Sequence, residues 1–187
     1  MNVLVGVTGS VAAIKAVELV AAILAKEPRV KIRIVVTARG RQFLKPDDLS
    51  VLARTCEKVH FDEHEWTEWS DKGDPVLHIE LRKWTDILLL APLSANTLAK
   101  ISNGLCDNLL TSVIRAWDPS KRMIICPAMN TFMWENPFTS RQLETVVEVY
   151  GAAVVPPKEE YVLACGDLGA GAMAAVPDIV AKVFEFK

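Results

Sequence analysis

The stretch DILLLAPLSANTLAKISNG, residues Asp86–Gly104, decides the fold. Its first part, Asp86–Pro92, is a run of strand length that is apolar enough to be buried on both faces. A helical pattern follows in Leu93–Gly104 and ends near the glycine, a common helix terminator. A strand that is buried on both faces belongs to a parallel sheet with helices on each side. The stretch therefore indicates an α/β protein.

The same strand-then-helix order recurs on both sides of this stretch. The pattern predicts further strands at Asn2–Val7, Lys31–Thr37, Arg122–Ala128 and Ala152–Pro157, and further helices at Ser10–Glu27, Asn108–Trp117, Thr139–Gly151 and Pro177–Phe186. This alternation predicts an α/β sandwich with a mostly parallel sheet. A chain of 187 residues is long enough for one sizeable core, so we expect a single domain over residues 1–187.

The composition argues against a nucleic acid or a membrane as the partner. Hydrophobic residues make up 51% of the chain and the formal net charge is −2, so bulk charge does not attract nucleic acid or an anionic membrane. No apolar run has the length needed to span a bilayer. The start, MNVLVGVTGS, lacks the charged region and the cleavage site of a signal peptide. We therefore expect a cytoplasmic protein.

The cysteines and histidines do not form a clear metal motif. None of the four cysteines belongs to a CxxC pair, and we expect reduced thiols, with Cys106 and Cys126 as small buried residues. His60, Asp62 and His64 suggest a metal site, but no second cluster has metal-site spacing. A solvated acidic loop is the better interpretation of this segment, and no metal is predicted.

Small and polar residues follow four of the predicted strands, in the sequences TGS, TARG, APLSANT and PAMN. Ligands bind parallel doubly wound sheets outside the carboxyl ends of the strands, so these segments are the place to look for a site. Gly9 and Ser10 lie at a strand-to-helix turn, where exposed backbone amides attract anions. Ser94, Asn96 and Thr97 lie at a second turn of the same kind. Neither turn matches a dinucleotide or triphosphate motif. The two turns therefore indicate a phosphate-binding site, but they do not identify the molecule to which the phosphate belongs.

Three residues allow both a structural and a chemical interpretation. Asn130 is a polar amide in the apolar stretch IICPAMNTFMW, and a buried amide needs a partner. His78 is either a structural histidine or an acid–base group. Cys165 lies in LACGDLGAGAMA, where dense glycines suggest a mobile flap or a backbone with positive φ. Its thiol is either a small hydrophobe or a proton donor, and the residues alone leave these alternatives open.

Five segments together resemble one family, the flavin-containing cysteine decarboxylases: TGSVAAIK, GDPVLHIELRKW, APLSANTLAKISNGLCDNLLTSVIRAW, PAMNTFMW and ACGDLGAGAMA. The resemblance runs from about Asn2 to Val176, and the pattern PxMNxxMW is complete from Pro127 to Trp134. It implies a Rossmann-like (flavodoxin-like) three-layer sandwich and a homotrimer with FMN at the contacts between subunits. It also implies FMN-dependent decarboxylation of a small-molecule substrate, 4′-phosphopantothenoylcysteine, to 4′-phosphopantetheine in coenzyme A biosynthesis.

The resemblance also implies roles for individual residues. His78 matches the family's active-site base, Cys165 its proton donor, and Asn130 the residue that grips the substrate. Residues Asn130, Ala164 and Met173 are expected to contact the substrate, beneath a flexible flap at about residues 156–175. The residues expected to bind FMN are Gly9, Ser10, Val11, Thr37, Arg39, Phe43, Ser94, Ala95, Asn96, Thr97 and Met129.

The sequence departs from the family pattern at the flap. Ala175 stands where the family usually has a glutamate, and Glu159, Glu160 and Tyr161 stand where relatives often have lysine or arginine. Two alternatives share the fold, a regulatory (phosphatase-inhibitory, salt-tolerance) flavoprotein and a peptidyl-cysteine decarboxylase. A flavin prenyltransferase is disfavoured because it should lack PxMNxxMW and ACGD. For a trimer, the apolar residues of NLLTSVIRAW are expected to supply the contact surface.

Overall fold

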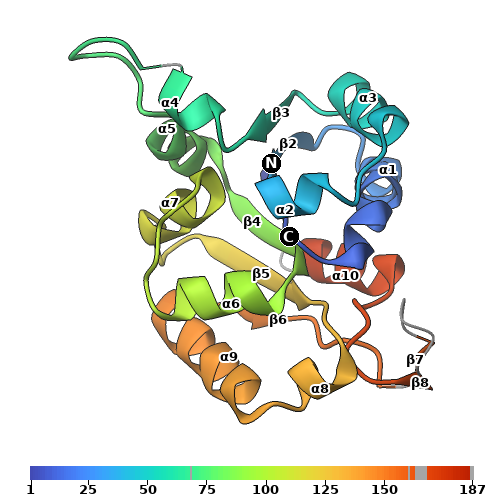
Figure 1. Cartoon of the computed structure of the whole chain (residues 1–187). Helices are drawn as coiled ribbons and strands as arrows, with labels where there is room; N and C mark the ends of the chain where they lie inside the picture. The colour runs from blue at the N-terminus through green and yellow to red at the C-terminus, as the bar shows by residue number, and fades with distance from the viewer. Residues whose placement is uncertain (68, 160, 163–167, 186–187) are drawn as a thin grey trace.

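The computed structural model describes residues 1–67, 69–159, 161–162 and 168–185, and it forms one parallel sheet with helices on both faces (Figure 1). The strands of this sheet are β1 (Asn2–Val7), β2 (Lys31–Val36), β3 (Lys58–Phe61), β4 (Ile87–Leu93), β5 (Arg122–Pro127) and β6 (Ala153–Val154). A separate antiparallel pair consists of β7 (Tyr161–Val162) and β8 (Leu168–Gly169).

A helix follows each of the strands β1 to β5, and another follows β8. The helices are the 3₁₀-helix η1 (Val11–Lys15) and the α-helices α1 (Ala16–Lys26), α2 (Ala38–Arg41), α3 (Pro46–Thr55), α4 (His64–Thr67), α5 (Leu77–Trp84), α6 (Ala95–Ser102), α7 (Leu109–Arg115), α8 (Thr131–Trp134), α9 (Pro137–Tyr150) and α10 (Val176–Phe184). Within the described part of the chain, no helix combines the length and the apolar character needed to cross a membrane.

The strand order confirms the predicted fold class, a single-domain, Rossmann-like three-layer sandwich. The order is β3-β2-β1-β4-β5-β6, and every pair of neighbours in it is parallel. The chain therefore winds outward from β1 in one direction and then outward from β4 in the other. In such a sheet the switch point, here between β1 and β4, leaves a crevice at the carboxyl ends of the two strands.

Two cores, one on each face, hold the layers together. Val3, Val5 and Val7 of β1 pack with α1, α3 and α10, whereas Leu4 packs on the other face with α5, α6, α7 and α9 (Figure 1). This alternation follows from the two-residue period of a strand. All seven residues of β4 are buried, which confirms that the strand in the middle of the sheet is apolar on both faces.

The structure differs from the sequence-based prediction in several elements. The edge strand β3 and helix α3 were not predicted, and the first helix, expected at Ser10–Glu27, begins as the 3₁₀-helix η1. His60 lies buried within β3, so the interpretation of its segment as a solvated loop was wrong at this residue. Cys126 is buried as expected, but Cys106 is exposed.

The expectation that the apolar residues of helix α7 contact a neighbouring subunit was wrong. The side chains of Leu109, Leu110, Val113 and Ile114 are buried inside the chain itself, in the core between α7 and the sheet. They cannot also cover a neighbouring subunit. The apolar side chains that remain exposed lie elsewhere, and they include Val11, Ile14, Phe43, Leu105, Phe132, Met133 and Phe138.

Candidate functional site

A buried threonine joins the two strands at the switch point. The Thr8 hydroxyl donates a hydrogen bond to the Pro92 carbonyl oxygen (Oγ1···O 2.8 Å) and accepts one from the Ser94 backbone N–H (N···Oγ1 2.8 Å). Thr8 has no exposed surface, so water does not compete for either bond. The carboxyl ends of β1 and β4 are thereby held together, and the turns that follow them open into the same space.

A serine caps the helix that follows each of these strands. The Ser10 hydroxyl accepts a hydrogen bond from the Ala12 backbone N–H at the start of η1, and the Ser94 hydroxyl accepts one from the Thr97 backbone N–H at the start of α6. The predicted Ser10 cap is confirmed. Each serine satisfies one backbone N–H at the start of its helix, and the Ser94 hydroxyl also donates to Thr97 Oγ1 (3.2 Å). The donors for a ligand are therefore the other backbone N–H groups of the two turns.

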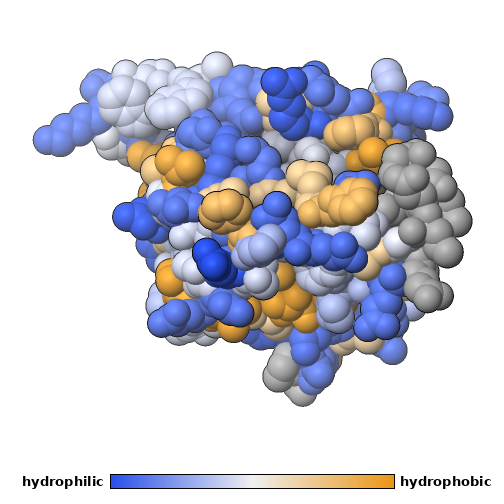
Figure 2. Space-filling view, turned by 60° about the horizontal axis from the view of Figure 1, so that its bottom comes forward, coloured by the Kyte–Doolittle hydropathy of each residue, from blue (hydrophilic) through white to orange (hydrophobic). Residues whose placement is uncertain are grey.

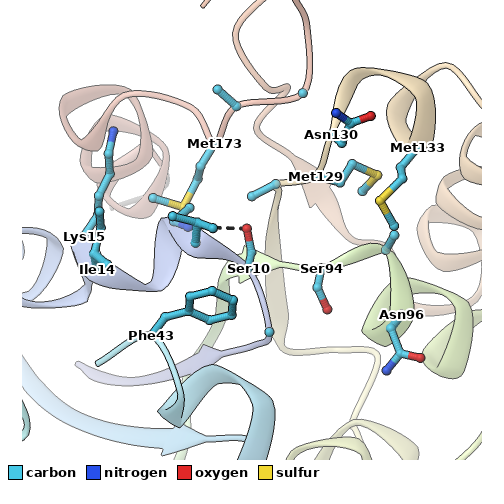
Figure 3. Close-up of a pocket in the computed structure, with 17 residues that line it drawn as sticks. Ser10, Ile14, Lys15, Phe43, Ser94, Asn96, Met129, Asn130, Met133 and Met173 are labelled. Atoms are coloured by element: carbon cyan, nitrogen blue, oxygen red, sulfur yellow. Dashed lines mark hydrogen bonds between the residues drawn. The ribbon is translucent and has the colours of Figure 1, made fainter. Parts of the chain in front are cut away.

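The larger of two adjoining cavities opens at this point and has a volume of about 550 Å³. Figure 3 shows side chains from several elements around this cavity. Ser10 and Ser94 come from the turns after β1 and β4, Phe43 from the segment after α2, and Met129 and Asn130 from the segment after β5, while Asn96 lies in the first turn of α6 and Met133 in α8. The other lining residues are Gly9, Val11, Ala12, Ile14, Lys15, Ala95, Ala128, Gly171, Ala172 and Met173. The lining is mostly apolar with a few polar groups, as is usual for small-molecule sites.

A second cavity, of about 450 Å³, shares Gly9, Ser94 and Asn96 with the first. It is the more polar of the two, because the other lining residues are Thr37, Ala38, Arg39, Asp62, Thr97, Lys100, Asp107 and Asn108. The two volumes together span the carboxyl ends of β1, β2 and β4. One end of this space is apolar and the other carries charged side chains.

The second cavity contains an ion pair, Lys100 with Asp107, and the further charged side chains Asp62 and Arg39. Burial raises the pKa of the Asp62 carboxyl, although the Ala38 backbone N–H donates a hydrogen bond to it (N···Oδ2 2.9 Å). A hydrogen bond from Lys100 lowers the pKa of Asp107 (Nζ···Oδ2 2.5 Å). Lys100 is thus neutralised by Asp107, and Arg39 adds an exposed guanidinium at the same cavity.

The glycine-rich segment docks directly on the segment after β5. The Met129 backbone N–H donates to the Gly171 carbonyl oxygen (2.9 Å), and the Thr131 hydroxyl donates to the Ala170 carbonyl oxygen (2.9 Å). Gly171 has φ of +109°, and a Cβ there would lie 2.4 Å from the Met129 carbonyl oxygen. Only glycine permits both this backbone conformation and this close approach.

Asn130 both caps helix α8 and lines the larger cavity. Its side-chain oxygen accepts a hydrogen bond from the Phe132 backbone N–H (2.9 Å) and so caps α8. The side chain is half-buried and stands at the edge of the larger cavity (Figure 3). The polar residue in an apolar stretch is therefore accounted for in part by helix capping.

His78 lies away from both cavities. It is on α5, which packs against α7 on the far side of the sheet from η1, and it is absent from the lining of either cavity (Figure 1). Its ring Nδ1 is hydrogen-bonded to Glu65 Oε1 (2.5 Å), and its backbone N–H donates to Glu65 Oε2 (3.1 Å). A single chain thus does not bring His78 to Asn130.

The structure gathers most of the residues that the sequence singled out. All eleven residues expected to bind FMN line one or both cavities, and Asn130 and Met173 line the larger one. Asn96 is exposed and lines both cavities. Cys165 and Ala164 lie outside the described residues. Sequence reasoning assigned no binding role to Lys15, Lys100 or Asp107, although they lie in segments that carry the family resemblance, and it named Asp62 only for a disfavoured metal site.

This fold and this site define a doubly wound α/β protein with a ligand cavity at the switch point of its sheet. The chain belongs to the Flavoprotein family, whose sequence profile matches residues 1–187.

Individual relatives cover nearly the whole chain. A mouse (Mus musculus) protein named phosphopantothenoylcysteine decarboxylase is 49% identical over 182 residues, which are 97% of this chain and 85% of the relative. A solved structure described as a cysteine-to-serine mutant of PPC decarboxylase, complexed with pantothenoylaminoethenethiol, has a TM-score of 0.89 and 48% identity, with 97% and 95% of the two chains covered. A solved structure described as the FMN binding protein AtHal3 has a TM-score of 0.86 and 48% identity, with 97% and 94% covered.

Proposed function

We propose that the protein is an FMN-dependent decarboxylase that converts 4′-phosphopantothenoylcysteine to 4′-phosphopantetheine, a step of coenzyme A synthesis. The observation that carries the proposal is the cavity between β1 and β4, in which a flavin-sized space meets Asn130 of the PxMNxxMW motif. The names of the relatives, at about half identity over nearly the full chain, support it.

The two adjoining cavities fit FMN in both size and chemistry. Their volumes, about 550 and 450 Å³, lie within the range of roughly 300–1,000 Å³ of small-molecule sites. Phe43 and Met129 suit a flat apolar ring, and the turns at Ser10 and Ser94, with Arg39 nearby, suit a phosphate. When bound, FMN would supply the hydride acceptor that oxidises the substrate's cysteine side chain and, later, the hydride donor that reduces the product.

The chain's own residues position the substrate and move protons. Asn130 holds the substrate's carboxylate and amide at the cavity edge, and the apolar neighbours strengthen these hydrogen bonds by excluding water. Met173 packs against the substrate from the glycine-rich segment. His78 takes the proton that leaves the substrate's thiol during its oxidation, while the hydride leaves from the adjacent carbon.

We assign the final proton donation to Cys165 and a substrate contact to Ala164, both within the ACGD motif. A cysteine thiol is a far stronger acid than a serine hydroxyl, so it is a suitable donor to an enethiolate carbon. The relative that lacks one cysteine and holds an enethiol supports a cysteine in this role. Residues 156–175 would form a flap over the substrate, with Gly171–Met173 on the cavity wall.

The site requires a second copy of the chain. His78 and Asn130 stand on separate parts of one chain, so the His78 that serves a given cavity comes from a neighbouring subunit. The exposed apolar residues Val11, Ile14, Phe43 and Met133 line the cavity and offer a surface for that neighbour. Figure 2 presents hydrophobic side chains in several groups among hydrophilic ones on one face of the molecule. We infer a homotrimer on these grounds and from the resemblance.

We also propose a cytoplasmic location. Coenzyme A precursors are small soluble metabolites, and the described cysteines, Cys56, Cys106 and Cys126, are free thiols, as expected in a reducing compartment.

Turnover with three substrates tests the proposed function. The FMN-loaded protein is incubated with 4′-phosphopantothenoylcysteine, with a peptide that ends in cysteine, and with free cysteine. We expect CO₂ and 4′-phosphopantetheine in equal amounts from the first substrate and little from the others. Turnover of the peptide alone would instead identify a peptidyl-cysteine decarboxylase. Tight FMN binding without CO₂ from any substrate would identify a regulatory flavoprotein.

A further inference from the structure

The hydrogen bonds around His78 assign a role to a carboxylate that no motif marks. Glu65 is on α4, thirteen residues before His78, and only 7% of its side chain is exposed, against 24% for His78. One carboxylate oxygen faces the ring Nδ1 of His78 and the other accepts the backbone N–H of the same residue. Both oxygens of a buried carboxylate are thus used on one histidine.

The backbone contact fixes the helix that carries His78. Helix α5 begins at Leu77, and its N-cap residue, Val76, provides no side-chain cap. Glu65 replaces that cap, because the His78 N–H is one of the donors left unpaired in the first turn of a helix. At the other end of α5, the Lys121 ammonium donates to the carbonyl oxygens of Arg82, Lys83 and Thr85. Charged side chains from elsewhere in the chain therefore hold α5 at both ends.

The ring contact fixes the tautomer of the histidine. An ionised carboxylate can only accept hydrogen bonds, so the ring nitrogen that faces it must carry the hydrogen. In the neutral ring this leaves Nε2 as the unprotonated nitrogen, on the side of the ring opposite Nδ1. The same arrangement, a buried carboxylate that orients a histidine by Nδ1–H, positions the general base in Ser-His-Asp hydrolases.

We propose that Glu65 is the positioning residue of this site: it holds His78 with the hydrogen on Nδ1 and leaves Nε2 to accept the proton of the substrate. The proposal rests on the proposed function, in which His78 is the base. Glu65 itself touches no substrate and acts only through His78.

The decisive variant is Glu65→Gln, because an amide has only one acceptor oxygen for the two N–H groups of His78. The amide oxygen keeps the backbone N–H, which has no other acceptor among the described residues, and the amide NH₂ then donates to Nδ1. His78 is thereby driven to the tautomer with the hydrogen on Nε2. We expect kcat to fall by about 100-fold or more, the usual range for loss of general base catalysis, with KM within about two-fold of the wild-type value.

Two further variants serve as controls. Glu63→Gln changes a carboxylate two residues away that is exposed and pairs with Arg41, so kcat should stay within about two-fold of the wild-type value. Glu65→Asp keeps an ionised carboxylate on a shorter side chain, so it should retain the Nδ1–H tautomer and recover part of the lost kcat. FMN absorbance and thermal melting establish that each variant is folded and loaded.

The tautomer is read directly by ¹⁵N NMR of the histidine rings, with His78 assigned by the signals that His78→Asn removes. We expect Nδ1–H in the wild-type protein and in Glu65→Asp, and Nε2–H in Glu65→Gln. The Nε2–H form in the wild-type protein overturns the proposal even if Glu65→Gln does not fold. So does a tautomer change in Glu65→Gln without loss of kcat, or an equal loss in Glu63→Gln. A wild-type protein without decarboxylase activity refutes the proposed function instead, and the ring spectrum still decides whether Glu65 sets the tautomer.

Discussion

Asn130 and Asn136 cap successive helices in the same way, but only Asn130 is among the residues that line the cavity. Each side-chain oxygen accepts the backbone N–H of the residue two positions on, Phe132 at 2.9 Å and Phe138 at 3.0 Å. The two asparagines thus share a structural role and differ in their access to a ligand. The pair allows the two roles of Asn130 to be separated by experiment.

Asn130→Ser should lose activity while the helix cap survives. Serine is as good an N-cap as asparagine, but it lacks the amide that would hold the substrate. We expect kcat/KM to fall by about 10- to 100-fold, the value of one hydrogen bond to a charged group, with FMN binding unchanged. The matched control is Asn136→Ser, which should keep wild-type kcat/KM. Equal activities in the two variants would limit Asn130 to capping.

Gly171→Ala should weaken FMN binding. A Cβ at this position lies 2.4 Å from the Met129 carbonyl oxygen, so the cavity wall must shift. With strain of about 1–3 kcal/mol at such a site, we expect FMN affinity to fall by about 10-fold, measured by quenching of flavin fluorescence. Gly73→Ala is the control, because Gly73 has a similar φ of +112° and a Cβ there would have no atom of the described residues within 4 Å. The same loss in both variants would mean that backbone strain alone is responsible.

Thr8→Val should destabilise the switch point. The change keeps the shape of the side chain but leaves the Ser94 backbone N–H without its acceptor, which costs about 1–3 kcal/mol of the free energy of unfolding. FMN affinity should fall as well, because the turn after β4 loses its hydrogen bond to the Thr8 side chain and is less firmly positioned beside the cavities. Thr85→Val, which removes a hydroxyl that donates to the Leu81 carbonyl oxygen, is a buried threonine control outside both cavities. Thr8→Val with unaltered FMN affinity would refute this role.

Cys56 should make the protein less stable in alkaline solution. Burial raises the pKa of its thiol to about 12, above the value of about 8.5 for an exposed cysteine. Because the folded-state pKa is the higher one, the stabilisation is fully present below pH about 8.5 and is lost as the pH rises toward 12. Urea denaturation should give a free energy of unfolding that falls faster in the wild-type protein than in Cys56→Ala, by about 1.4 kcal/mol per pH unit. Parallel pH curves would contradict this.

Five of the six strands of the sheet were predictable from the sequence, including the edge strand β6, but the other edge strand, β3, was not. The strand β4 is buried along its whole length, so its composition alone identified it. The edge strand β3, KVHF, is short and begins with an exposed lysine, so no apolar run marks it. Helix α5 was missed because its first turn is capped by Glu65 from thirteen residues upstream, and no local pattern contains that information.

Part of the candidate site was also predictable from the sequence, and part was not. The turns at Ser10 and Ser94 follow strands directly, so the rule for parallel sheets located them. Lys100 and Asp107 reach the second cavity only through the packing of α6 and the turn after it, and the sequence did not single them out. The expectation that NLLTSVIRAW forms a subunit contact was wrong because a buried helix and an interface helix have similar apolar composition.

The central claim is a decarboxylating site completed by two copies of the chain, and mixed trimers test it most directly. His78→Asn and Asn130→Ser are co-expressed with different tags, and complexes that carry both tags are assayed for CO₂ release from 4′-phosphopantothenoylcysteine. In a mixed cyclic trimer one of the three subunit contacts pairs the intact His78 with the intact Asn130, so we predict about one third of wild-type activity. Each variant alone should be far less active. Mixed trimers no more active than the single variants would contradict the account.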